Sequence, residues 1–117
     1  MLEIAEELMR LGELRDSGKF GGRDLEDGTF TLSNIGSIGG RIANPVVFAP
    51  QSCIGALGAV RKRAVVDDSS AEVVVRDMVT VSWAADHRIV DGATMAMFNR
   101  RWKEFVEGPE GMLAHMK

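Results

Sequence analysis

The hydrophobic residues at the start of the chain follow a helical period. They recur every three or four positions, at Ile4, Leu8, Leu11 and Leu14. Charged residues fill most of the remaining positions, so the pattern predicts an amphipathic helix over residues 1–15. No capping residue or lead-in precedes this helix at Met1, although folded domains usually begin with one. We therefore expect the chain to be part of a longer domain.

The middle of the chain is predicted to form strands. Residues 29–33 form a short segment that alternates with the period of two typical of strands, and residues 53–66 and 72–84 are expected to form two long strands. Polar residues 67–70 lie between the longer segments and favour a turn, so we predict a hairpin of two long strands. The side chains that share one face near the end of the second strand are Val79, Val81 and Trp83.

The clearest helical pattern lies near the carboxyl end, over residues 91–107. The positions that form its apolar stripe are Met95, Phe98, Trp102 and Phe105. Asp91 is a suitable N-terminal cap, because its carboxylate can accept a hydrogen bond from a free backbone N–H. Gly108 and Pro109 end the helix, and residues 110–116 are expected to form a short last helix. Strands and helices together predict an α/β fold class.

The composition is that of an ordinary globular chain of one domain at most. The 117 residues are 45% hydrophobic and 26% charged, with a net charge of −3. This charge provides no electrostatic footprint for nucleic acid, so no nucleic-acid partner is expected. The uncharged residues 42–60 contain two prolines and are not a membrane span, so no membrane partner is expected. Cys53 is the single cysteine, which excludes an internal disulfide framework.

The residues best suited to chemistry lie in one segment between the second long strand and the second helix. Within six residues it contains Asp86, His87, Arg88 and Asp91. Histidine is the usual general base near neutral pH, and a nearby carboxylate orients either an imidazole or an arginine. The alternative interpretation is a structural turn with a solvated ion pair, and the residue types alone leave both open.

Other kinds of chemistry have weaker support in the sequence. His87 and Asp91 supply two metal ligands, but no spacing resembles a zinc or iron site, so we expect no metal. No serine lies in a G-x-S-x-G motif, which argues against a hydrolase, and Cys53 is expected in the core. The glycine-rich residues 34–40 predict an irregular loop without the partners of a nucleotide-binding loop. Basic residues 61–63 are expected on a solvated face.

Two motifs carry a resemblance to a known family. Residues 86–92, Asp-His-Arg-Ile-Val-Asp-Gly, match the D-H-R-x-x-D-G signature of the dihydrolipoamide acyltransferase (E2) catalytic domain of 2-oxoacid dehydrogenase complexes. Residues 28–40 resemble the F-T-[IL]-S-[NS]-x-G-x-x-G-G block of the same family. The 54 residues that separate Ser33 from His87 are also similar to the family spacing. The wording of both motifs most resembles the branched-chain 2-oxoacid member.

The resemblance implies an α/β fold like that of chloramphenicol acetyltransferase, a two-layer sandwich with a mixed sheet and helices. Residues 1–117 then correspond to the C-terminal portion of a single catalytic domain, without the lipoyl and E1/E3-binding domains. The implied partners are copies of the chain in trimers and larger cores, a lipoyl domain, and the E1 and E3 components through the parent protein. The implied compartment is the mitochondrial matrix, or the cytoplasm in a bacterium.

The resemblance also implies an activity, the transfer of an acyl group between a dihydrolipoyl thiol and the thiol of coenzyme A. The acyl group is expected to be branched-chain, coenzyme A is a substrate, and the lipoyl group is carried on a separate domain. By the same resemblance His87 is the general base, Ser33 donates a hydrogen bond to the tetrahedral oxyanion from the facing subunit, and Asp91 is a positioning residue. The positions that resemble the lining of the coenzyme A channel are Ser33, Asn34 and Gly58.

The chain departs from the family pattern at residues 51–53, Gln-Ser-Cys, where P-E-x-A is usual, and at Arg41. The sequence places both departures away from the histidine motif, so they are expected to affect packing or coenzyme A binding. Two alternatives stay open. One is an enzyme like chloramphenicol acetyltransferase, although that family prefers a doubled histidine where Asp86 and His87 stand here. The other is a truncated fragment that assembles without turnover, and we expect the isolated chain to have little or no activity.

Overall fold

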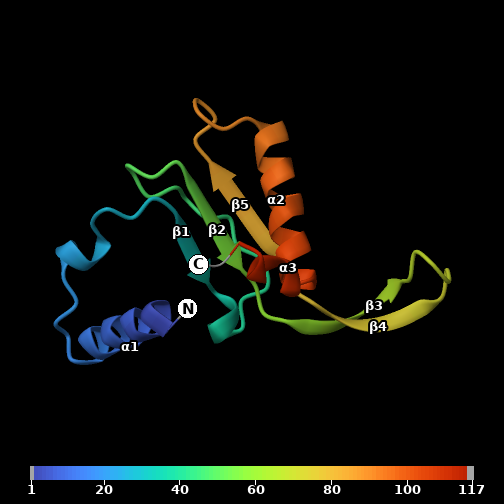
Figure 1. Cartoon of the computed structure of the whole chain (residues 1–117), viewed down its shortest axis with the longest axis horizontal. Helices are drawn as coiled ribbons and strands as arrows, with labels where there is room; N and C mark the ends of the chain where they lie inside the picture. Colours follow the sequence, from blue (N-terminus) through green and yellow to red (C-terminus); the bar gives the residue numbers. More distant parts are fainter. Residues whose placement is uncertain (1, 116–117) are drawn as a thin grey trace.

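A three-stranded sheet with one long helix against it forms the centre of the computed structural model, which describes residues 2–115 (Figure 1). The helices are α1 (Leu2–Asp16), α2 (Gly92–Glu107) and α3 (Glu110–Leu113). The strands are β1 (Thr31–Asn34), β2 (Cys53–Leu57), β3 (Arg61–Val66), β4 (Val73–Met78) and β5 (Val81–Ala85). Two short 3₁₀ turns lie at Gly22–Leu25 and Gly36–Ile38.

The central sheet is mixed, which agrees with the predicted fold class. Its strand order is β1-β2-β5, with β1 and β2 parallel and β2 and β5 antiparallel. The middle strand β2 is an apolar run, and its Ile54 and Ala56 are the buried apolar side chains of the described chain. A strand with neighbours on both sides is shielded from water along both edges, which explains why the core lies there.

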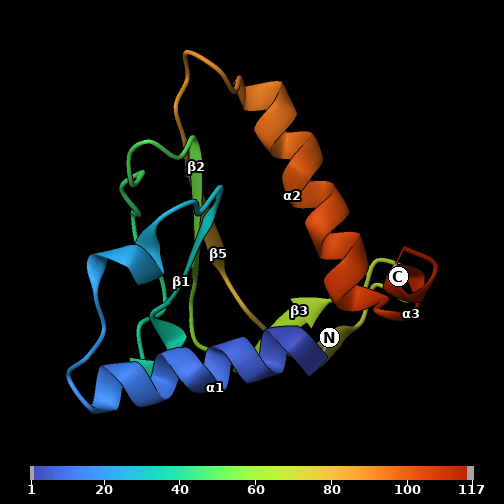
Figure 2. The same ribbon diagram turned by 60° about the vertical axis from the view of Figure 1, so that its left-hand side comes forward.

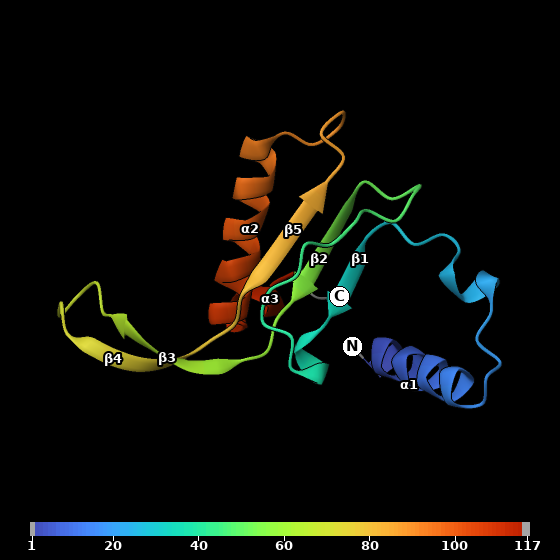
Figure 3. The same cartoon turned by 180° about the vertical axis from the view of Figure 1, so that it is seen from behind.

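The predicted hairpin is correct in its pairing and wrong in its continuity. The first long strand divides into β2 and β3 and the second into β4 and β5, so β2 pairs with β5 and β3 with β4. The first long strand is interrupted between β2 and β3 because the loop at Gly40 pairs with it there. The backbone N–H of Ala59 donates to the carbonyl of Gly40 at 2.8 Å. A Cβ atom on Gly58 would lie 2.1 Å from the carbonyl oxygen of Arg41, so only glycine fits there. Figure 3 shows the β3–β4 ribbon projecting away from the sheet.

Helix α2 packs on the sheet face that carries Trp83. The Trp83 indole donates to the Asn99 side chain at 2.8 Å, and its ring centre lies 5.2 Å from Phe98 and 5.5 Å from Trp102. Opposite it in the sheet is Gly55, where an added Cβ would lie 2.3 Å from the indole ring. Phe98 and Trp102 of the predicted apolar stripe therefore face the sheet, whereas Phe105 lies against His115. Val81 shares the Trp83 face as expected.

The ends of the elements agree closely with the sequence pattern. Asp91 caps α2 as predicted, because its carboxylate accepts the Thr94 backbone N–H at 2.7 Å. Helix α1 covers the first predicted helix, with Met1 outside the described residues. Helix α3 ends at Leu113, earlier than the predicted residue 116, which also lies outside them. The first strand begins two residues later than predicted, at Thr31.

The chain exposes far more surface than a globular protein of its mass. Its accessible surface is 9483 Å², whereas about 6,200 Å² is typical of a folded 12.7 kDa monomer. Its radius of gyration is 17.0 Å, against about 13 Å for a compact chain of this length. Helix α1 lies beside the ends of the strands without burying a side chain (Figure 2). Large apolar side chains exposed on α1 and on the ribbon are Leu2, Ile4, Leu8, Met9, Val66, Val73 and Val75.

Candidate active site

His87 lies in the turn that joins β5 to α2, and its side chain is exposed. The turn begins at Asp86, whose backbone N–H donates to the carbonyl of Ser52 at 2.8 Å. The Asp86 carbonyl accepts the N–H groups of Ile89 at 3.0 Å and Val90 at 2.9 Å. A strand precedes the turn and a capped helix follows it, so rigid elements hold this histidine at both ends.

The Asp86 carboxylate binds the arginine that follows His87. It accepts the backbone N–H of Arg88 at 3.0 Å, the guanidinium Nε at 2.9 and 3.0 Å, and Nη2 at 2.5 Å. The hydrogen bonds from the Arg88 side chain and backbone lower the pKa of Asp86 to about 2. Of the two orientations that the sequence leaves open, the structure shows the carboxylate orienting the arginine, in an ion pair that is largely solvated on the arginine side.

Asp91 holds the other end of the histidine turn. Hydrogen bonds from Thr94, first from its backbone and then from its side chain, keep the pKa of Asp91 below its ordinary value, and the nearby His87 adds to this effect. The Asp91 carbonyl also accepts the Met95 N–H at 3.1 Å, which starts the helical ladder. Asp91 therefore fixes the first turn of α2 four residues after His87.

Ser33 lies on β1, two strands away from β5. It pairs with Ala56, which pairs with Ser82, whereas Leu32, Gly55 and Trp83 form the adjacent row. Since Trp83 faces α2, Ser33 points to the opposite face of the sheet. Strand spacing and rise place its Cα about 14 Å from that of Ala85, and His87 lies two residues further along. The structure does not bring Ser33 and His87 together within one chain.

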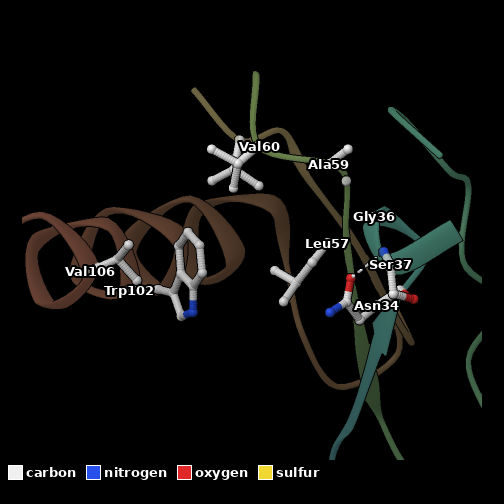
Figure 4. Close-up of a pocket in the computed structure, with 10 residues that line it drawn as sticks. Asn34, Gly36, Ser37, Leu57, Ala59, Val60, Trp102 and Val106 are labelled. Carbon is white, nitrogen blue, oxygen red and sulfur yellow. Dashed lines mark hydrogen bonds between the residues drawn. The ribbon is translucent and has the colours of Figure 1, made fainter. Parts of the chain in front are cut away.

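Asn34 and Gly58, by contrast, lie in one cavity of about 460 Å³ (Figure 4). Asn34 and Ser37 form its polar side, where the Asn34 side-chain amide oxygen accepts the Ser37 backbone N–H at 3.3 Å. Leu57, Val60, Trp102 and Val106 form its apolar side. Ser33 is not among the residues that line it. The structure thus joins two of the three predicted coenzyme A residues and separates the third.

The prediction that residues 51–53 lie away from the histidine motif is wrong. The Ser52 carbonyl accepts the Asp86 N–H, and Cys53 pairs directly with Ala85. The pairing of β2 with β5 causes this proximity, and a single sequence gives no register for it. Cys53 is half-buried rather than in the core. Sequence reasoning also misses the Trp83–Asn99 hydrogen bond, for which the placement of Asn99 beside the apolar stripe is the only signal.

Metal and membrane features were also sought in the described chain. Within residues 2–115, no group of three His, Cys, Asp or Glu side chains is arranged to hold a metal ion. None of the helices in the same range has the length and apolar character needed to cross a membrane. Basic residues 61–63 are exposed as expected, with Lys62 paired to Asp77 at 3.1 Å.

The sequence is similar to known acyltransferases along its whole length. The model of the family described as 2-oxoacid dehydrogenases acyltransferase (catalytic domain) matches residues 1–114. The mitochondrial lipoamide acyltransferase component of the branched-chain alpha-keto acid dehydrogenase complex is 50% identical in Mus musculus and 51% identical in Caenorhabditis elegans. Both matches cover 100% of this chain, and they cover 24% and 26% of those relatives. The chain therefore spans about a quarter of their length.

Solved structures support the same fold. The Azotobacter vinelandii dihydrolipoamide acetyltransferase superimposes with a TM-score of 0.87 and 30% identity, over 96% of this chain and 45% of that one. That structure was solved to investigate the role of a serine, a histidine and an asparagine in its catalytic mechanism. The cubic core of the pyruvate dehydrogenase multienzyme complex gives a TM-score of 0.86 and 31% identity, with the same coverage. These similarities confirm the predicted chloramphenicol-acetyltransferase-like α/β fold.

Proposed function

Because the chain belongs to the family of 2-oxoacid dehydrogenase acyltransferase catalytic domains, we propose that it forms part of the active site of a dihydrolipoamide acyltransferase. Residues 1–117 are the C-terminal portion of the catalytic domain in this proposal. The reaction is transfer of an acyl group between a dihydrolipoyl thiol and coenzyme A. A branched-chain acyl group is favoured by the relatives from Mus musculus and Caenorhabditis elegans, whose complexes are branched-chain.

The spacing of three residues carries the proposal. In the Azotobacter vinelandii enzyme the investigated histidine follows the serine by 52 residues and precedes the asparagine by four. Here His87 follows Ser33 by 54 residues and precedes Asp91 by four. Because the exposed His87 lies between a strand and a capped helix, a substrate can reach it while its backbone stays fixed.

The proposed chemistry begins with proton transfer to His87. A free thiol with a pKa of about 8.5 is mostly protonated at neutral pH, so a base in contact with it raises the thiolate concentration at the moment of attack. The coenzyme A sulfur then bonds to the thioester carbon, and the carbonyl π electrons move to oxygen. When the tetrahedral intermediate collapses, the dihydrolipoyl sulfur leaves and takes the proton from His87. The same steps run backwards in the opposite direction.

Ser33 completes the site from a neighbouring copy in this proposal. Its hydroxyl would donate a hydrogen bond to the oxyanion, and loss of one such donor typically costs roughly 10²–10³ in rate. Ser33 and α2 lie on opposite faces of the sheet, and His87 lies in the turn that leads into α2, which supports a contribution of the serine from a second chain. A trimer of copies, assembled further into larger cores, would supply the second chain, and the resemblance to the cubic core of a multienzyme complex supports such an assembly.

The remaining components follow from the family and from the cavity. Asn34 and Gly58 line a cavity with one polar and one apolar side, which suits the amide and hydrocarbon parts of the pantetheine arm of coenzyme A. The lipoyl group arrives on a lipoyl domain, and the E1 and E3 components bind through the parent protein. The mitochondrial names of the branched-chain relatives support a location in the mitochondrial matrix, whereas a bacterial source would place the protein in the cytoplasm.

A hybrid enzyme tests this proposal directly. In it, residues 1–117 of this chain replace the matching segment of the Caenorhabditis elegans relative, with which they share 51% identity. We expect the assembled hybrid to transfer a branched-chain acyl group from dihydrolipoamide to coenzyme A, and to leave chloramphenicol unmodified. An assembled hybrid that acetylates chloramphenicol instead would favour the alternative enzyme class. An assembled hybrid inactive with both acceptors would contradict the proposed function.

The exposed apolar surface favours a second candidate for the chain on its own, a non-catalytic assembly element. The total accessible surface exceeds that of a typical monomer of this mass by about 3,000 Å². Many of the exposed side chains are large and apolar, which promotes association. We expect isolated residues 1–117 to associate in sedimentation experiments and to show little or no acyl transfer. Clear turnover by the isolated chain would exclude this candidate.

A further inference from the structure

The two residues that flank His87 in the sequence, Asp86 and Arg88, bind each other. Four hydrogen bonds run from the Arg88 backbone and guanidinium to the Asp86 carboxylate. The same aspartate donates its N–H to Ser52 and accepts the N–H groups of Ile89 and Val90. Asp86 therefore connects the turn that carries His87 to Ser52, which directly precedes β2, and to Arg88.

The bonds from the Asp86 carboxylate are of two kinds. The bond from the Arg88 backbone N–H closes an Asx-turn, which fixes the backbone directions at His87. The bonds from the guanidinium form a charge-assisted fork that uses both carboxylate oxygens. An asparagine at this position would keep the acceptor for the first bond and lose the charge of the second, so the two contributions can be separated.

The Asp86 charge is already neutralised by Arg88. The low pKa of Asp86 has hydrogen bonds from Arg88 as its causes, and no hydrogen bond joins this carboxylate to the imidazole in the described chain. Asp91, the other carboxylate near His87, is bound to the start of α2. The arrangement of Asp86 therefore suits it to fix the direction of the His87 side chain.

We infer that Asp86 is a positioning residue. It directs the His87 imidazole through the Asx-turn and the hydrogen bonds with the Arg88 guanidinium, and not through an electrostatic effect of its carboxylate on the imidazole. The inference rests on the proposed role of His87 as the base. A base must lie within hydrogen-bonding reach of the thiol, and a displacement of about 1 Å costs up to about 10²-fold in rate. The side chain of His87 is exposed in the described chain, so its direction depends on the backbone of the turn that carries it.

The test compares variants of the assembled hybrid enzyme. Asp86→Ala removes both kinds of bond, and we expect kcat to fall about 10- to 100-fold while both KM values stay within about twofold. Asp86→Asn keeps the Asx-turn acceptor, and we expect it to restore most of kcat with an unchanged pH midpoint of kcat/KM. Arg88→Lys keeps the charge and loses the fork, and we expect a smaller decrease than with Asp86→Ala.

Asp67→Ala is the matched control. Asp67 likewise combines an Asx-turn with an arginine pair: it accepts the Ser69 N–H at 3.0 Å and pairs with Arg76. It lies in the β3–β4 turn, which Figure 3 shows far from the β5–α2 turn. We expect this variant to keep the kcat of the hybrid. The control removes an Asx-turn and an arginine pair in the same way, so it measures the effect of such a loss on assembly alone.

Several results would overturn the inference. An Asp86→Ala enzyme with full kcat would show that Asp86 does not position the His87 imidazole. An Asp86→Asn enzyme as impaired as Asp86→Ala, with its pH midpoint shifted downward, would show that Asp86 acts through charge, because removal of a nearby negative charge lowers a histidine pKa. If Asp86→Ala does not assemble, Asp86→Asn and Arg88→Lys decide by the same criteria. Failure of the proposed function is distinguishable, because the unsubstituted hybrid would then be inactive.

Discussion

The separation of Ser33 from His87 leads to a complementation experiment. Within one chain Ser33 lies on β1 and faces away from α2, whereas His87 lies in the turn after β5, so we propose that each active site takes its histidine from one copy and its serine from the next. Two variants of the hybrid enzyme, His87→Ala and Ser33→Ala, each lack one group in every site. Alone, each is expected to have about 1% of the unsubstituted activity or less.

Random mixing of the two variants restores complete sites only if the groups come from different chains. In an equal mixture, the histidine of a site comes from a Ser33→Ala chain with a probability of one half, and the serine from a His87→Ala chain with the same probability. About a quarter of all sites then contain both groups. Because about a quarter of the trimers hold one variant only and have no complete site, each mixed trimer has one complete site in three and recovers about a third of the activity. If both groups came from one chain, every site would still lack one, and the activity would stay near 1%.

The assay uses co-expressed variants with two different affinity tags. Purification over both tags selects mixed assemblies, and their rate of acyl transfer to coenzyme A is compared with that of each variant alone and with an equal mixture of separately assembled variants. The separately assembled mixture is the control, because it contains the same chains without mixed sites. Mixed assemblies no faster than this control would refute the shared site.

Two further predictions concern the packing that supports the histidine turn. Gly55→Ala places a Cβ 2.3 Å from the Trp83 ring, so we expect thermal unfolding of the hybrid to show a loss of roughly 1–3 kcal/mol, whereas Gly12→Ala, with no atom within 4 Å, is expected to be neutral or stabilising. Equal unfolding midpoints would contradict this packing. Asp91→Ala removes the cap of α2 and is expected to lower kcat by up to about 10²-fold, whereas Asp91→Asn, which can still cap, is expected to keep the unfolding midpoint. Identical behaviour of the two Asp91 variants would show that capping is not its role.

The sequence patterns correctly predicted the features that depend on residues close together in the chain. The apolar stripe of α2 and its cap at Asp91 depend on residues within one or two turns, and both are confirmed. The division of the long strands at Gly58 depends on the contact between Ala59 and Gly40, which are nineteen positions apart. The apolar run of β2 continues past Gly58 to Val60, and hydrophobicity reports which residues are buried in a strand and not which segment pairs with it.

The site shows the same difference between local and distant information. The sequence concentrates Asp86, His87 and Arg88 in one segment, but residue types do not decide whether the aspartate binds the imidazole or the guanidinium. Backbone geometry decides it, because the Asx-turn brings Arg88 back toward the carboxylate. The adjacency of Ser52 to this turn depends on the register of β2 with β5, which is set by the whole sheet.

The central claim, that His87 is the base of acyl transfer, is tested most directly by the rate of the assembled His87→Ala hybrid. Loss of a general base typically costs 10²–10⁴-fold, so the account predicts a fall in kcat of at least about 100-fold with assembly unchanged in sedimentation. His115→Ala is the control, because it removes the other histidine of the chain, which contacts Phe105 far from the turn. A His87→Ala hybrid that assembles and keeps most of its activity would contradict the account.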